Sequence, residues 1–250
     1  MRRKGIFVIF TFLMLCLLIS GVFYFKKMSV YALKFEGFRQ YDTDNFSILY
    51  KSESEKDLMV VAQAAEKAYK IVGEDFDFYP KERVTIIIYP DSQSLQEAFG
   101  WPSDESTQGV YYRGTIYVQA PGAWIKDRSD IYNSFFEKGP MIHEYTHLVV
   151  DELTGGNHSR WFTEGVAQYE EERVTGYTLR QDFDVKEGEY YSIEEIFYSF
   201  DNLADVAKAY ITALDMTKAL AGSEGIRSLK EIMAELKDGA SSNDIFLERA

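Results

Sequence analysis

The chain has 250 residues, 46% of them hydrophobic and 16% aromatic, a composition that favours one packed globular domain and excludes a disordered chain. From residue 28 onward it contains 22 Lys and Arg residues and 40 Asp and Glu residues, a formal charge of −18. Such a surface repels phosphate groups, so we expect no nucleic-acid partner.

The first predicted element is an apolar helix at the N-terminus. Three basic residues at positions 2–4 precede an almost uninterrupted apolar run over residues 6–25, and two lysines close it. A run of this length at helical rise is enough to cross the hydrocarbon core of a bilayer. A cleaved signal peptide is the alternative, but the run is long for one and no small-residue cleavage site follows. We therefore predict a single-pass signal anchor over residues 1–27 in the cell membrane, with the rest of the chain outside the cytoplasm because the basic residues favour a cytoplasmic N-terminus.

The segment after this run is predicted to be a tether that leads into the folded domain. Residues 28–44 are expected to be the juxtamembrane tether, and residues 45–50 (NFSILY) a strand. Ser54 and Asp57 have the spacing of a capping box, which predicts a helix from there to about Val72.

The middle of the chain is rich in predicted strands. Residues 83–89 (RVTIIIY) are β-branched and apolar, and Asp91 is placed to cap a short helix after them. Residues 109–120 (GVYYRGTIYVQA) contain two alternating runs around Arg-Gly, which predicts a hairpin. An early helix, then strands, then helices alone after about residue 135 predict an α+β domain over residues 45–250 rather than a doubly wound sheet.

The second half is predicted to be helical. A proline near residue 140 suits a first helical turn, and a Gly-Gly pair some fifteen residues later suits its end. Another helix is expected from about Thr163 to Val174, and Ser192 with Glu195 forms a second capping box. Further helices are expected over residues 203–221 and 224–237.

The sequence HEYTH lies near the start of the first of these helices. His143 and His147 are four residues apart, so both imidazoles lie on one helical face and can bind the same ion. Glu144 is offset to the flank of that face, where it can reach a metal-bound water without ligating the metal. The bare pattern also occurs on ordinary helices with two incidental histidines, so a metal site needs a third ligand.

Three positions are candidates for that ligand. A histidine six residues after His147 would complete a three-histidine site, but Leu153 occupies that position. His158 lies on a Gly-Gly-Asn-His-Ser loop, where we expect exposure to solvent. Glu164 is expected in the first turn of the next helix, and the adjacent Gly165 allows close helix approach. Two imidazoles and one carboxylate leave one zinc position open for water, which is the catalytic pattern rather than the structural one.

The two motifs together resemble a known family. HEYTH, sixteen further residues, and then Glu164 within WFTEGVAQYEE are similar to the gluzincin metallopeptidases, particularly the bacterial peptidase MA-like domains. The resemblance extends more loosely over about residues 45–240. It implies a thermolysin-like zincin catalytic domain with a mixed sheet, an HExxH helix and a helical C-terminal part. Gln168 departs from the pattern, because those enzymes have an acidic partner for a zinc histidine at that position.

The resemblance also implies a set of roles at the site. One Zn²⁺ would be bound by His143, His147 and Glu164, and Glu144 would be the general base that activates water against a peptide bond. Tyr210 would donate to the oxyanion; the alternatives are that Tyr210 merely packs a helix or that His158 is the donor instead.

The remaining predictions concern a substrate-binding strand and two acidic segments of the helical half. By the same resemblance, a substrate peptide would add to an exposed strand at Ile116 to Val118, with a hairpin that only covers the core as the alternative. Asp151, one turn after His147, and the acidic run at 169–174 (YEEERV) are expected to be solvated.

We therefore predict a membrane-anchored zinc metallopeptidase that acts on a peptide or protein substrate. The alternative is a catalytically inactive zincin-fold domain that binds a peptide or another partner outside the cytoplasm. The intact Glu144 argues against inactivity, because a zinc scaffold alone does not need this base. A helix pair without metal would require the two histidines and Glu164 to be placed by accident.

Overall fold

The structure is a computed structural model that describes residues 36–101, 107–183 and 190–249. The chain divides into two compact units, Met1–Phe38 and Arg39–Ala250, and the second contains all the elements described below. Within the described ranges, no helix is both long and apolar enough to cross a membrane. The anchor predicted over residues 1–27 lies outside the described residues.

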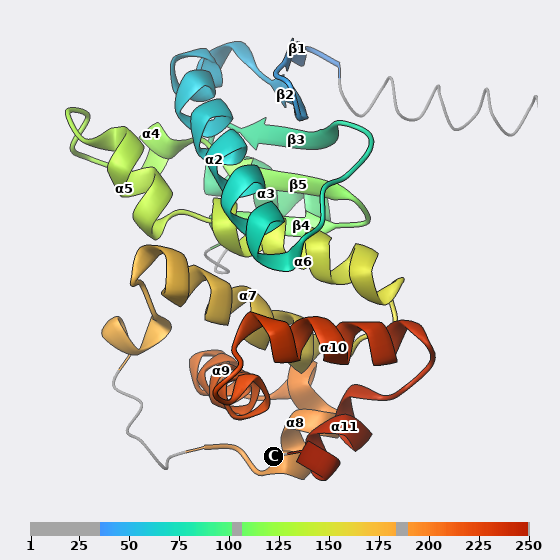
Figure 1. The fold of residues 1–250 in the computed structure, drawn as a ribbon. Coiled ribbons are helices and arrows are strands. Elements are labelled where there is room, and N and C mark those ends of the chain that lie inside the picture. The colour runs from blue at the N-terminus through green and yellow to red at the C-terminus, as the bar shows by residue number, and fades with distance from the viewer. Residues whose placement is uncertain (1–35, 102–106, 184–189, 250) are drawn as a thin grey trace, which may run out of the picture. The chain divides into compact units, whose positions relative to one another are not determined.

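The described residues form one five-stranded mixed sheet in the order β1-β2-β3-β5-β4 (Figure 1). Its strands are β1 (Arg39–Asp42), β2 (Phe46–Tyr50), β3 (Val84–Tyr89), β4 (Gly109–Tyr112) and β5 (Thr115–Gln119). The three inner strands are parallel, and β1 and β4 run antiparallel to their neighbours. Because β1 lies within the segment expected to be a tether, the folded unit begins before residue 45.

Within the described residues after β5, every element is helical, as predicted. The α-helices are α2 (Leu58–Phe76), α3 (Ser92–Phe99), α4 (Pro121–Trp124), α5 (Ile131–Lys138), α6 (Met141–Thr154), α7 (Arg160–Thr175), α8 (Ile193–Ser199), α9 (Val206–Ala221), α10 (Ile226–Lys237) and α11 (Ser242–Arg249). Short 3₁₀ turns are η1 (Ser52–Asp57), η2 (Leu179–Gln181) and η3 (Phe200–Asn202). Figure 1 shows α6 between the sheet and the C-terminal helices, with α7 alongside it.

The core lies where the sheet meets α2 and α6. Parallel pairing of β2 with β3 requires a crossover, and α2 provides it. Ile48 of β2 is in register with Ile86 of β3, and both side chains are fully buried. Because α6 is packed on both sides, most of its residues are buried, which fixes the face that its histidines present.

Several local sequence signals are confirmed. The Asp91 side chain caps α3 by accepting a backbone N–H of its first turn. The β4–β5 hairpin turns at Arg113 and Gly114, whose φ values of 49° and 79° match the left-handed conformation of a two-residue hairpin loop. Ser192 and Glu195 form the predicted capping box at the start of α8.

The capping box predicted at Ser54 and Asp57 is wrong. These residues belong to the 3₁₀ turn η1, and no side chain caps α2. The carboxylate of Asp57 instead accepts from Nη1 of Arg128 at 2.7 Å, a contact between residues far apart in sequence. The helix that follows is also longer than predicted. It continues to Phe76, and the left-handed conformation of the next residue, Asp77 (φ 54°), ends it.

The start of α7 also differs from the prediction. The helix begins at Arg160 rather than near Thr163, so Glu164 lies in its second turn. Trp161 lies in the added first turn, where its ring is buried and its Nε1 donates to Oδ1 of Asn243 at 2.8 Å. This contact with α11 is not visible in the local sequence.

Candidate metal centre

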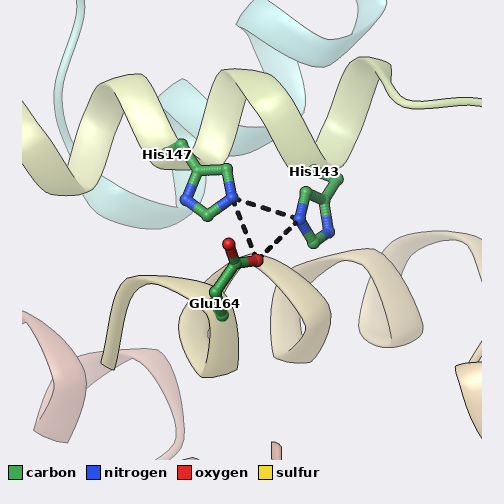
Figure 2. A group of neighbouring side chains, drawn as sticks. All are labelled: His143, His147 and Glu164. Carbon is green, nitrogen blue, oxygen red and sulfur yellow. Dashed lines mark hydrogen bonds and ion pairs between the residues drawn. The ribbon is translucent and has the colours of Figure 1, made fainter. Parts of the chain in front are cut away.

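His143 and His147 of α6 and Glu164 of α7 converge on one point (Figure 2). The two Nε2 atoms are 3.1 Å apart, and Oε2 of Glu164 lies 3.3 Å from Nε2 of His143 and 3.4 Å from Nε2 of His147. All three donor atoms lie within 4.8 Å of one another. Two imidazole nitrogens and one carboxylate oxygen form a donor set that fits zinc. These residues could therefore hold a metal ion.

Close packing of α7 places Glu164 at this point. Gly165 packs against α9, where a Cβ would overlap Thr217 Oγ1 and the carbonyl of Ala213. The expectation that this glycine permits close helix approach is confirmed. Because any larger residue would push α7 away from α9, the glycine helps to fix the position of the neighbouring carboxylate.

The electrostatics of the cluster favour a cation. Burial by itself lowers the pKa of His143, but the carboxylates of Glu164 and Glu171 hold that pKa well above its ordinary value. Burial by itself raises the pKa of Glu164, yet the imidazoles of His147 and His143 hold it well below its ordinary value. The site therefore stabilises positive charge between buried carboxylates, which is the property that a metal ion requires.

The ring nitrogens that face away from the cluster are held by α7. Nδ1 of His147 lies 2.7 Å from Oγ1 of Thr163, and Nδ1 of His143 lies 3.3 Å from Oε2 of Glu171. The prediction that residues 169–174 form a solvated face is wrong, because Glu170 is fully buried and the Glu171 carboxylate is buried as well. Its spacing of seven residues from Glu164, two helical turns, is the signal that sequence analysis overlooked.

Arg160 and Tyr210 hold the second carboxylate oxygen of Glu164. Nε of Arg160 donates to Oε1 over 2.7 Å, and the Tyr210 hydroxyl donates to the same oxygen over 3.0 Å. Burial and the neighbouring carboxylate raise the pKa of Tyr210, so its phenol stays protonated as a donor. Arg160 was overlooked in the sequence, although it lies one helical turn before Glu164. These contacts leave Oε2 to face the histidines.

Glu144 lies beside the cluster and contacts the edge strand β4. Its Oε2 accepts the backbone N–H of Tyr111 at 2.5 Å, and burial raises the pKa of the carboxyl. Gly109 allows β4 to lie this close to α6, because a Cβ there would overlap the ring of Pro140. The predicted general base therefore lies between the metal cluster and the edge strand β4.

Asp151 is less solvated than predicted, because it is only partly exposed and both of its carboxylate oxygens have partners. Its Oδ2 accepts the hydroxyl of Tyr111 at 2.6 Å, and its Oδ1 lies 3.5 Å from Nε2 of His158. Tyr111 therefore spans α6 from Glu144 to Asp151, with its ring stacked at 6.5 Å over that of His147. His158 lies outside the metal cluster and is only partly exposed.

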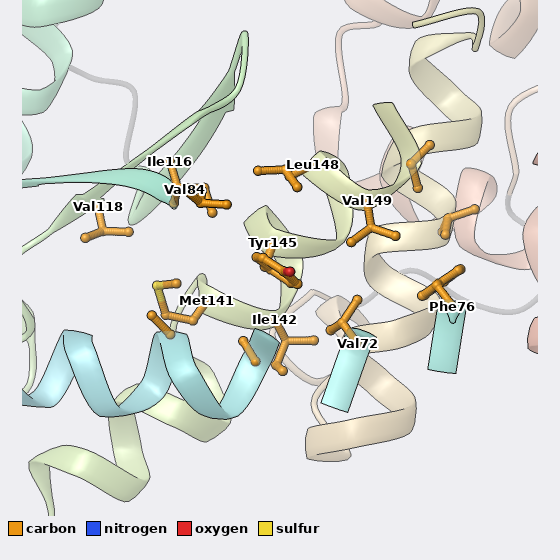
Figure 3. Packing of buried hydrophobic residues seen from close by; sticks show 14 of the residues in the cluster. Val72, Phe76, Val84, Ile116, Val118, Met141, Ile142, Tyr145, Leu148 and Val149 are labelled. Carbon is orange, nitrogen blue, oxygen red and sulfur yellow. The ribbon is translucent and has the colours of Figure 1, made fainter. Parts of the chain in front are cut away.

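The prediction of an exposed substrate strand at Ile116 and Val118 is wrong. Both residues belong to β5, which is paired with β3 on one side and β4 on the other. Their side chains are fully buried and point toward Met141 and Tyr145 of α6 in Figure 3. The hairpin places β4 outside β5 because β5 pairs in parallel with β3, so in the described part of the chain β4 is the edge beside Glu144.

A family model described as "Peptidase MA superfamily" matches residues 64–249. This range contains the metal cluster and every helix from α3 onward. A search of curated proteins found no match.

Proposed function

Because the chain belongs to the peptidase MA superfamily, we propose that it is a zinc metallopeptidase that cleaves a peptide or protein substrate. The observation that carries the proposal is the convergence of His143, His147 and Glu164 on one point, with Glu144 directly beside them. Three protein ligands with a neighbouring carboxylate are the arrangement of a catalytic rather than a structural zinc site.

Zinc held by these three residues would polarise the amide carbonyl and lower the pKa of a water molecule to about 7. Glu144 would accept the proton of this water as its oxygen attacks the carbonyl carbon. It would then pass the proton to the amide nitrogen as the C–N bond breaks. Burial raises the pKa of Glu144 above its ordinary value, which makes this carboxylate a stronger proton acceptor than an exposed glutamate and supports its role as the base.

Tyr210 is proposed as the donor to the oxyanion. Its hydroxyl lies 3.0 Å from a carboxylate oxygen of Glu164, which places a neutral donor beside the metal cluster where the reacting carbonyl would bind. The alternative from the sequence, a tyrosine that only packs a helix, does not account for a hydroxyl in contact with the metal cluster.

The edge of β4 is proposed as the substrate surface in place of β5. A peptide that adds to this edge would replace Glu144 as the acceptor of the Tyr111 N–H, which the carboxylate accepts in the structure. β4 runs from Gly109, beside Pro140, to Tyr111, beside Asp151. An antiparallel peptide would therefore place its C-terminal part toward Pro140.

Membrane attachment through residues 1–27 remains part of the proposal, with the domain outside the cytoplasm. It rests on the length of the apolar run and on the basic residues before it. Fractionation of cells that produce the tagged chain, followed by protease treatment of intact cells, tests it: release of the chain without detergent would contradict the anchor.

The test of the enzymatic proposal compares the full-length chain with Glu144→Gln. Both proteins are expected to contain zinc, and only the parent is expected to release fluorescent fragments from labelled casein, because the amide cannot accept the proton of water. If both bind zinc and neither cleaves any protein in a broad substrate panel, the alternative of an inactive domain that binds a peptide is favoured.

A further inference from the structure

Tyr111 of the edge strand β4 is the residue from which the following inference starts, and the inference rests on the proposed substrate edge. Its hydroxyl donates to Oδ2 of Asp151 on α6 at 2.6 Å. The same hydroxyl accepts the backbone N–H of Gly114, in the turn of the β4–β5 hairpin, at 3.1 Å. The phenol therefore joins the hairpin to the metal-binding helix through both its donor and its acceptor.

The rest of β4 is weakly held. The strand has four residues, and within the described ranges it pairs only with β5. Tyr112, the next residue, points to the opposite face of the strand and is 48% exposed. Among the described residues, the hydrogen bond of Tyr111 to Asp151 is the one that a β4 side chain makes to α6. Loss of this bond would therefore loosen the edge of the sheet.

The bond lies next to the place where a substrate would pair with β4. The backbone N–H of Tyr111 is accepted by Oε2 of Glu144, so it points toward the metal-binding helix and away from β5. The ring of Tyr111 is stacked on that of His147, with 6.5 Å between the centroids. The position of Tyr111 on α6 therefore sets how far the backbone of a paired peptide lies from His147.

The acceptor makes this contact stronger than an ordinary hydrogen bond at a surface. Burial and the carboxylate of Asp151 raise the pKa of Tyr111, so the phenol remains the donor. The other carboxylate oxygen of Asp151 lies 3.5 Å from Nε2 of His158, which holds the carboxylate from its other side. A hydrogen bond to a charged group typically shifts an equilibrium by about tenfold or more.

We propose that Tyr111 is a positioning residue for the substrate: its hydroxyl, held by Asp151, clamps β4 onto α6 and keeps the Tyr111 N–H in place for a substrate carbonyl. Without this clamp, the edge strand would have to be ordered each time a peptide binds, which weakens binding. Because the clamp acts on binding and not on the reacting atoms, it contributes to KM rather than to kcat.

The first test measures backbone hydrogen exchange of the full-length chain after incubation with zinc. Tyr111→Phe keeps the ring over His147 and removes only the hydroxyl. Exchange over residues 109–114 is expected to become about tenfold faster, with the zinc content unchanged, because a local opening loses one hydrogen bond. Tyr41→Phe is the control, since it removes an exposed hydroxyl from β1, the edge strand on the other side of the sheet. It is expected to exchange like the parent.

Variants of Asp151 test whether its carboxylate is the partner that matters. Asp151→Asn keeps an acceptor for the hydroxyl, so its exchange is expected to stay within about threefold of the parent. Asp151→Ala removes the acceptor and is expected to match Tyr111→Phe. Adding Tyr111→Phe to Asp151→Ala should then change the exchange little further, because both substitutions remove the same bond. Two effects that simply add would contradict the pairing.

A kinetic measurement separates the positioning role from general support of the fold. The substrate is a fluorogenic octapeptide copied from a site at which the parent cleaves casein. Tyr111→Phe is expected to raise KM about tenfold and to leave kcat within about threefold of the parent. Asp151→Asn, which keeps the acceptor, is expected to have nearly the KM of the parent. Faster exchange with an unchanged KM would refute a role in substrate binding.

The outcomes distinguish this inference from the proposed function. Exchange in Tyr111→Phe within twofold of the parent would refute the clamp and leave the peptidase proposal intact. A parent that cleaves no protein would refute the peptidase proposal, and the exchange measurement, which needs no activity, would still decide whether the clamp exists. Loss of zinc from Tyr111→Phe would show that the hydroxyl supports the metal site instead and would overturn the inference.

Discussion

The protein is expected to lose stability as the pH rises, because the buried carboxyl of Glu170 must then ionise. The substitution Glu170→Gln is expected to remove this loss. Glu170 is fully buried on α7, where its two carboxylate oxygens accept from Nε of Arg173 at 3.0 Å and from Nη2 at 2.9 Å. Asp75 of α2 contacts the same guanidinium. One arginine is therefore shared by two carboxylates, which makes the ionised form of the buried one expensive.

The sign and size of the effect follow from the pKa of this carboxyl. Burial, only partly offset by Arg173, raises the pKa of Glu170 from 4.5 to about 7. Between pH 4.5 and pH 7 the folded state binds more protons at Glu170 than the unfolded chain does. The stability that the protonated carboxyl contributes is therefore complete below pH 4.5 and is lost as the pH rises through 7. At about 1.4 kcal/mol per pKa unit, the parent should lose about 2–3 kcal/mol from this group between pH 5 and pH 8.

The assay is urea unfolding of parent and variant at pH 5 and pH 8, with metal removed by a chelator. Glutamine stays neutral at both values, so the variant should lack this loss. The free energy of unfolding changes between pH 5 and pH 8 in each protein. The difference between these two changes reports Glu170 alone, because the other titrating groups are the same in both proteins. Glu172→Gln, which removes a surface carboxylate from the same helix, is the control. A change in unfolding free energy that agrees within about 0.5 kcal/mol between parent and Glu170→Gln would refute the reasoning.

Three further predictions concern the site and its support. Glu164→Ala should lower the zinc content from about one ion per molecule to a small fraction, measured by mass spectrometry, because two imidazoles alone bind zinc weakly; an unchanged content would exclude this ligand. Tyr210→Phe should reduce kcat about 100-fold on any cleaved peptide with zinc content unchanged, whereas lost zinc would indicate that the hydroxyl supports Glu164 instead. Gly165→Ala should destabilise the protein by about 1–3 kcal/mol in urea unfolding, because its Cβ would overlap Thr217; unchanged stability would contradict the close approach of α7 and α9.

The sequence determined the features that depend on residues close together in the chain. The four-residue spacing of His143 and His147 places them on one helical face wherever the helix lies. The Asp91 cap, the hairpin and the second capping box are equally local, and each is present in the structure. Glu164 was identified as a candidate because its motif is short and distinctive, and α7 brings it to the two histidines.

The tertiary structure decided the features that depend on pairing between distant segments. Ile116 and Val118 have the same alternating pattern at an edge or inside a sheet, and only the parallel pairing of β5 with β3 makes them core residues. The partner of His143 depended on the direction in which α7 crosses α6, which brings Glu171 to that ring and leaves Gln168 for α9. A helical pattern records which residues share a face, whereas the neighbour of that face is set by packing across the whole domain.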